Sequence, residues 1–158
     1  MKKKITNSFL VFCLFLTINC GFKVLDKSEI NNFTIKEIAT NGDERINFKI
    51  KNYLLINSVK NTENILVIDL KTEKTKSIKE KNIKNEITKY QISIAVNIKF
   101  RSVKINKIDK INLVVSGSYL TADNYSQSLN NEKILIDNLV ENISSKIIDE
   151  ISFKINDI

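Results

Sequence analysis

Cys20 is the residue of this sequence whose type and position most clearly indicate chemistry, because it directly follows an N-terminal apolar segment. The chain begins with three lysines at residues 2–4, and residues 5–18 are mostly apolar. This run is shorter than the roughly 20 residues that a membrane-spanning helix needs, and its basic flank is typical of a secretory signal peptide. A lipoprotein signal peptidase leaves a cysteine in this position, here followed by Gly21, as the new N-terminus. We therefore predict a lipoprotein signal peptide at residues 1–19 and lipidation of Cys20.

Two alternatives stay open at this end of the chain. The apolar segment can instead be retained as a single-pass anchor, and Cys13 is a second cysteine, although it lies inside the apolar run. Ile18 and Asn19 also differ from the small residues that usually precede a lipidated cysteine, so processing at Cys20 is itself a hypothesis. If it occurs, several acyl chains attach the protein permanently to a membrane, because a single chain anchors only marginally.

The composition excludes several other kinds of chemistry. The chain has no histidine, two cysteines, three glycines and no proline, so a zinc site, a histidine base and a glycine-rich phosphate loop are not expected. Carboxylates are plentiful, but none forms a recognisable catalytic pair, and no nucleophile has a base at an interpretable spacing. We therefore expect no enzyme activity, no cofactor and no metal. For a secreted lipoprotein, the formal net charge of +7 does not indicate a nucleic-acid partner; the excess lysines either face an anionic partner or form a solvated surface.

The spacing of apolar residues predicts the elements that position the polar side chains. Residues 33–38 form a short strand that ends in a polar cluster, in which Asn41 or Asp43 is suited to cap a helix. Apolar residues then recur at helical spacing and predict a helix over residues 43–57. The segment 63–70 is rich in β-branched residues and predicts a second strand.

The clearest pattern in the chain is the strict alternation over residues 90–101. It predicts a half-buried antiparallel strand with one face on the core and one face on polar surroundings. A polar hairpin tip is expected near residues 79–86 before this strand, and a fourth strand follows at residues 111–119. The alternating apolar residues of the third strand are Tyr90, Ile92, Ile94, Val96, Ile98 and Phe100.

From about Asn130 the apolar residues recur at the period of a long amphipathic helix. Its apolar stripe is expected to run from Leu135 or Ile136 to Ile158, and charged residues, including Glu132, are assigned to the opposite side. Such a helix could lie on a membrane, but a four-stranded sheet needs a cover, so packing on the sheet is favoured. The sequence thus predicts an α+β fold: a two-layer sandwich with a four-stranded, mostly antiparallel sheet and two helices packed on one face.

The first residues after the predicted cleavage site resemble a known family. Cys20-Gly21-Phe22-Lys23-Val24-Leu25 is similar to the Cys-Gly-aromatic-basic-x-Leu start of LptE, the lipopolysaccharide-assembly lipoprotein of Gram-negative outer membranes. Residues 35–55 resemble that family's first strand, turn and helix, residues 77–92 its loop and third strand, and residues 130–132 the start of its closing helix. The resemblance implies a single LptE-like α+β domain over residues 20–158.

The resemblance also implies a location and a partner. Members of the family are anchored in the outer membrane, with the domain facing the periplasm or lying inside the lumen of the large β-barrel LptD. They plug this barrel, assist its assembly and take part in inserting lipopolysaccharide into the outer leaflet. Because a barrel lumen is polar, a plug must present a polar surface. The uncovered face of the third strand is therefore the expected barrel contact, with the residues Ser93, Asn97, Lys99 and Arg101.

Four lysines around the hairpin tip are the expected lipopolysaccharide contacts: Lys79, Lys81, Lys84 and Lys89. A lysine ammonium acts as a compact point charge and suits phosphate attraction without fixing its geometry. Each of these lysines can equally be a hydrated surface group in a lysine-rich chain. The alternative to the barrel plug is a stand-alone lipoprotein that binds or carries a lipid in a cavity between sheet and helices. That function requires more apolar positions on the strands than the helices can cover. Here the apolar faces of the strands and the apolar stripes of the helices are roughly matched.

Overall fold

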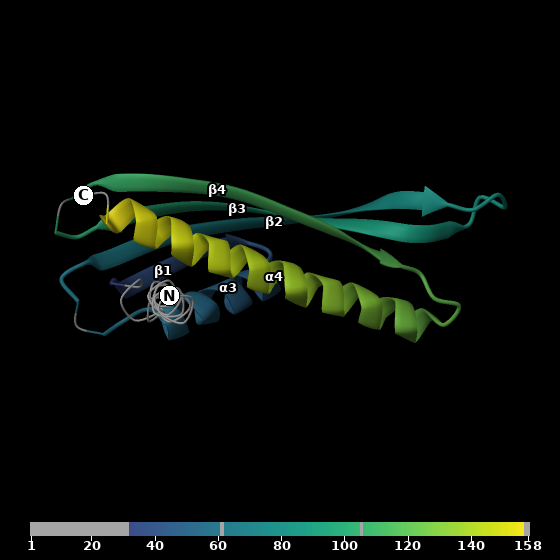
Figure 1. The fold of residues 1–158 in the computed structure, drawn as a ribbon, viewed down its shortest axis with the longest axis horizontal. Coiled ribbons are helices and arrows are strands. Elements are labelled where there is room, and N and C mark those ends of the chain that lie inside the picture. Colours follow the sequence, from purple (N-terminus) through teal and green to yellow (C-terminus); the bar gives the residue numbers. More distant parts are fainter. Residues whose placement is uncertain (1–31, 61, 105, 157–158) are drawn as a thin grey trace, which may run out of the picture.

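The four strands form one sheet, and both helices pack on the same face of it (Figure 1). The structure is a computed structural model that describes residues 32–60, 62–104 and 106–156, so Cys20 and Ile158 lie outside the described residues, as does the predicted signal peptide. β1 pairs with β2 in parallel, and the other two pairs are antiparallel. The fold class predicted from the sequence is confirmed. In chain order the elements are β1 (Thr34–Gly42), α3 (Glu44–Asn57), β2 (Ile65–Lys81), β3 (Ile87–Ser102), β4 (Ile108–Leu120) and α4 (Tyr125–Asn156).

A polar junction joins β1, α3 and β2. The hydroxyl of Thr72 donates a hydrogen bond to Asn47 Oδ1 (2.9 Å), and Asn47 Nδ2 donates to the carbonyl oxygen of Asn41 (3.0 Å). Asp43 caps α3, because its Oδ1 accepts a hydrogen bond from the backbone N–H of Ile46 (3.0 Å). Thr72 and Asn47 are both buried, and these bonds satisfy their polar side chains. The junction fixes the start of α3 relative to the sheet.

The first strand is longer than the sequence predicted. It was expected to end at Ile38 before a turn at residues 40–43, but β1 continues to Gly42, which pairs with Thr72 of β2. The polar residues favour a turn locally, whereas parallel pairing with β2 keeps the backbone extended. The predicted strand end is therefore wrong.

The core lies between the sheet and the two helices. On β3, the alternate apolar side chains from Ile92 to Phe100 are buried, as the alternation predicted. On β4, Gly117 allows α4 to approach closely, because a Cβ at this position would lie 2.6 Å from Leu135 Cδ1. The buried apolar residues of α4 are Leu139, Val140, Ile143, Ile147, Ile148 and Ile151. Removing this apolar surface from water is the main stabilising contribution to the fold.

β2 and β3 form a hairpin that is longer than the helical layer. On the side of β2 that faces the helices, the apolar residues from Leu66 to Leu70 are buried, and Thr72, Lys74 and Lys76, which follow them, are polar. α3 begins beside Thr72, because the backbone N–H of Asp43 donates to the Thr72 carbonyl oxygen (3.4 Å). The part of β2 that follows Thr72 is therefore not covered by α3. β4 ends opposite Lys89. The end of the hairpin therefore projects beyond both elements, as Figure 1 shows.

α4 begins earlier than predicted. It starts at Tyr125 instead of Asn130, and Asn124 Oδ1 accepts a backbone hydrogen bond (2.8 Å) at its start. Its apolar stripe faces the sheet as predicted. Glu132 was assigned to the outer side of the helix, but its carboxylate accepts a hydrogen bond from the Tyr119 hydroxyl of β4 (2.7 Å). That assignment is wrong, because the first turns of α4 lie beside the polar part of the sheet and not over its apolar core.

We expect Gly42→Ala to destabilise the domain by about 2–4 kcal/mol. Gly42 has a φ of +99°, and a Cβ here would lie 1.9 Å from the Thr72 carbonyl oxygen. The measurement is the free energy of unfolding from urea denaturation. Asn41→Ala is the matched control, because Asn41 is exposed and its contribution to the junction comes from its backbone carbonyl. Equal stability of the two variants would contradict this account of the junction.

Candidate functional site

The face of the sheet opposite the helices is open to solvent and largely polar. On this face, Asn97, Lys99 and Arg101 of β3 are exposed, and Ser93 is half-buried. The structure thus brings together on one surface the four residues that the sequence predicted as barrel contacts, while their role stays a prediction. Val114 and Ile108 of β4 are apolar exceptions on this face, with 67% and 63% of their surfaces exposed.

Cross-strand neighbours extend this polar surface over three strands. The hydroxyls of Ser93 and Ser116 lie 2.8 Å apart, and Lys99 lies between Asp69 of β2 and Lys110 of β4 in the register of the sheet. Charges of both signs therefore alternate with neutral polar groups. We define the open sheet face by its outward polar side chains: Asp69, Lys71, Glu73, Ser93, Asn97, Lys99, Arg101, Lys110, Asn112 and Ser116.

The predicted lysines lie at the projecting end of the hairpin, but they are not equivalent. Lys79, Lys81 and Lys84 are exposed, and none of them forms an ion pair with another described residue. Lys89 instead forms an ion pair with Glu80 (2.6 Å). Three of the four lysines therefore have no ion-pair partner among the described residues. Their contact with lipopolysaccharide stays a prediction.

A second polar cluster connects the base of the hairpin to α4. Lys76 Nζ lies 2.5 Å from Glu132 Oε2, and the Tyr119 hydroxyl donates to the same oxygen (2.7 Å). Lys76 Nζ also lies 4.3 Å from the centre of the Tyr90 ring, and the rings of Tyr90 and Tyr119 stack with their centres 5.7 Å apart. A cation above an aromatic face is attracted by the electron density of the ring. We call these four residues the Lys76 cluster.

The partners within the Lys76 cluster determine its protonation. Partial burial by itself raises the pKa of Glu132, but hydrogen bonds from Lys76 and Tyr119 outweigh burial and hold this pKa below the ordinary value. Burial by itself lowers the pKa of Lys76, yet the bonds to Glu132 and Tyr119 raise it above the ordinary value. For Tyr119, burial is the first cause of a raised pKa. At neutral pH the cluster therefore holds a charged Lys–Glu pair and a neutral tyrosine.

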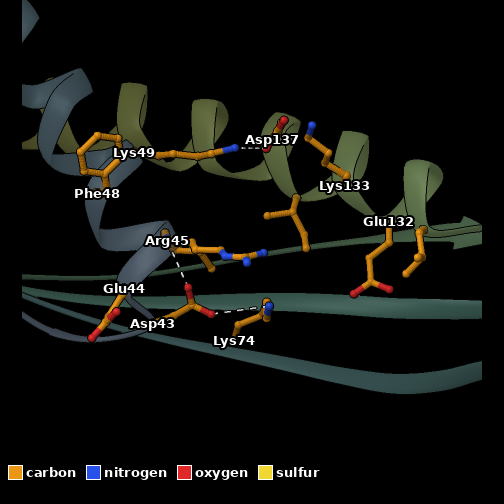
Figure 2. Close-up of a pocket in the computed structure, with 12 residues that line it drawn as sticks. Asp43, Glu44, Arg45, Phe48, Lys49, Lys74, Glu132, Lys133 and Asp137 are labelled. Carbon is orange, nitrogen blue, oxygen red and sulfur yellow. Dashed lines mark hydrogen bonds and ion pairs between the residues drawn. The ribbon is translucent and has the colours of Figure 1, made fainter. Parts of the chain in front are cut away.

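A groove of about 660 Å³ lies between the start of α3, β2 and the first half of α4 (Figure 2). Its lining includes four acidic and four basic side chains as well as apolar ones. Two ion pairs cross or border it: Lys74 with Asp43 (3.5 Å) and Lys49 with Asp137. Figure 2 shows the guanidinium of Arg45 reaching over the groove from α3. The lining surface of the groove is mostly apolar, with Ile46, Phe48, Leu129 and Ile136 among its residues, but charged side chains border it and it is open to solvent. It therefore differs from the enclosed cavity that buries most of a small ligand.

None of the helices in the described part of the chain is long and apolar enough to cross a membrane. Among the same residues, no group of three or more acidic, cysteine or histidine side chains is arranged to hold a metal ion. The features available for function are therefore the open sheet face, the hairpin end, the Lys76 cluster and the groove.

Comparison with known proteins defines the class of fold. Rare lipoprotein B from Shewanella oneidensis is similar to this chain with a TM-score of 0.59 and 11% identity, over 76% of this chain and 97% of that chain. The solution structure of an uncharacterized lipoprotein B from Nitrosomonas europaea is similar with a TM-score of 0.54 and 12% identity, over 84% of this chain and 90% of that chain. No protein-family model matches the sequence, and no curated protein matches it. The chain thus has the fold of bacterial proteins that are named lipoproteins.

The sequence analysis missed the Lys76 cluster. Lys76 lies in a highly charged segment where no single lysine stands out, and Glu132 was assigned to solvent. One signal was present: Tyr90 and Tyr119 occupy the core-facing positions at the ends of two alternating strands. Tyrosines in such positions place a hydroxyl at the edge of the core, where it needs a polar partner.

We expect Glu132→Gln to lower the free energy of unfolding by about 1 kcal/mol at pH 7. Because the pKa of Glu132 is lowered on folding, its contribution is present above its ordinary value of 4.5 and is lost as pH falls through the folded-state pKa. The difference between wild type and variant should therefore be constant from pH 6 to 8 and shrink below about pH 4.5.

The measurement is urea denaturation of both proteins across this pH range. Glu80→Gln serves as the control, because the Glu80 side chain is 50% exposed in its pair with Lys89 and solvent screens the interaction. If the difference in the free energy of unfolding between wild type and Glu132→Gln does not change with pH, the assigned ionisation of Glu132 is wrong.

Proposed function

We propose that this chain is an outer-membrane lipoprotein that plugs an LptD-type β-barrel, assists its assembly and takes part in the insertion of lipopolysaccharide into the outer leaflet. Cys20 would carry the lipid anchor. The proposal joins three observations: the signal-like N-terminus, the resemblance of residues 20–25 to the LptE start, and a fold similar to that of lipoprotein B proteins.

The observation that carries the proposal is the open sheet face. A sheet in a two-layer sandwich has one covered and one uncovered side, and here the uncovered side holds charges of both signs over three strands. A surface of this kind suits a polar, water-accessible wall better than a hydrocarbon environment. The lumen of a barrel supplies such a wall, and the elongated shape of the domain lets the sheet lie along it (Figure 1).

The hairpin end supplies the second element of the proposal. Lys79, Lys81 and Lys84 project beyond the helical layer without an ion-pair partner among the described residues, and so an anionic glycolipid that passes the plug would meet them first. Lysines attract phosphate groups without demanding one orientation, which suits a ligand that must move on. Lys89 is a weaker candidate, because Glu80 already neutralises it.

The alternative, a stand-alone lipoprotein that carries a lipid between sheet and helices, has less support. It needs an enclosed apolar cavity, whereas the groove beside α3 is open to solvent and is bordered by the ion pairs of Lys74 with Asp43 and Lys49 with Asp137. The buried apolar residues of β3 pack against those of the helices in one core.

The test is affinity purification of the tagged full-length protein from detergent-solubilised envelopes of its host, with partners identified by mass. We expect a large outer-membrane β-barrel in equal amount. The double variant Lys99→Glu/Arg101→Glu should lower barrel recovery by about tenfold or more, because it reverses two adjacent charges on the open sheet face.

Lys146→Glu/Lys133→Glu is the matched control. It also reverses two exposed charges, but these lie on α4. The control should recover the barrel as wild type does, and circular dichroism should show that both variants are folded. Purification of the domain alone with a bound lipid would contradict the proposal and favour the carrier function.

A further inference from the structure

The turn at the end of the β2–β3 hairpin holds an apolar side chain in a fully exposed position. Ile83 has a relative exposure of 104%, the highest among the exposed large apolar residues of the described chain. Ile78 and Ile87 lie in the strands below it, where Ile78 is 50% exposed and Ile87 is half-buried, whereas Ile83 lies at the apex. Exposing an isoleucine in this way stabilises nothing in the domain itself.

The turn that presents Ile83 is well defined. Asn82 Oδ1 accepts hydrogen bonds from the backbone N–H groups of Lys84 and Glu86 (both 3.0 Å), and its Nδ2 donates to Glu86 Oε2 (2.7 Å). Backbone bonds between Asn82 and Glu86 and from Asn85 to Asn82 close the same turn (both 2.9 Å), and Asn85 has a positive φ of 63°. Asparagine tolerates this conformation better than most residues. The side chain of Ile83 is therefore held outward by a bonded turn.

The charges around the apex have one net sign. Lys81 Nζ donates to Asn85 Oδ1 (2.9 Å) and Lys79 Nζ to Ser118 Oγ (3.3 Å), so the partners of both are neutral. The turn also holds one carboxylate, Glu86, whose Oε2 accepts from Asn82, and the three lysines outnumber it. Lys84 directly follows Ile83 and is exposed. An apolar apex with a net positive surround matches an anionic lipid surface, in which the apolar group enters the acyl boundary and the ammonium groups stay among the phosphates.

We propose that this apex, Ile83 with Lys79, Lys81 and Lys84, inserts into the surface of an anionic lipid bilayer. A bilayer fits better than a protein partner, because flexible lysines fix no geometry and laterally mobile headgroups can adjust to them. This inference does not depend on the barrel partner.

The test uses the chain from residue 20 with Cys20→Ser, which carries no acyl chain. The described core lies between Phe33 and Ile151, so this chain contains all of it. Vesicles are made either of equal parts of phosphatidylglycerol and phosphatidylcholine or of phosphatidylcholine alone. We expect cosedimentation with the anionic vesicles only, and added salt should weaken it. Ile83→Ser should lower the partition coefficient by about tenfold or more, and Lys84→Glu by about fivefold or more.

A dye at the apex tests insertion directly. Because Cys13 and Cys20 are both absent from this chain, Ile83→Cys provides a single thiol for an environment-sensitive fluorophore. Its emission should shift to the blue with anionic vesicles. The control is Ile56→Cys, which is 81% exposed but lies at the end of α3 remote from the hairpin turn. An unshifted apex dye, equal binding to neutral vesicles, or unchanged binding of Ile83→Ser would each overturn the proposal. Because no barrel is present, failure here is separate from failure of the barrel purification.

Discussion

The structure depends on the register of the β2–β3 hairpin. In this pairing, Ile68 lies opposite Phe100 and Leu70 opposite Ile98, so that alternate residues of both strands face the helices together. A shift by one residue would turn charged side chains such as Lys99 into the core and the apolar set into solvent. The cost of burying these charges fixes the register, and the register then fixes which surface of the sheet stays open.

The unequal lengths of the layers follow from the same hairpin. The strands of the hairpin are longer than α3, and on the helix-facing side of β2 the apolar residues give way to Thr72, Lys74 and Lys76 where α3 begins. Beyond this point the Lys76 cluster takes over the contact with α4, through charge-assisted hydrogen bonds instead of apolar packing. The domain therefore combines an apolar half, which supplies most of the stability, with a polar half that projects the hairpin end.

Two surfaces with different chemistry result from this arrangement. The open sheet face is broad, mixed in charge and held by backbone pairing, so it suits a polar partner surface of similar extent. The hairpin end is narrow, basic and tipped by Ile83, so it suits a lipid surface. A lipid anchor at Cys20 would keep both near a membrane and so raise the effective concentration of weak contacts.

The sequence by itself determined the fold class, because each strand and helix carries its own apolar period. The alternation from Tyr90 to Phe100 specified a strand with one polar face, and Asp43 was among the residues expected to cap the first helix. The four residues expected on the open face were found there for the same reason.

Only the tertiary structure decided where elements end and which charged residues meet. β1 continues to Gly42 because β2 pairs with it, and Lys76 meets Glu132 because α4 crosses the sheet at that point. Neither contact has a local signal, since the partners are far apart in the sequence and each is one of many similar residues. Local periodicity reports which side of an element is apolar, whereas the pairing of distant polar groups depends on how the elements pack.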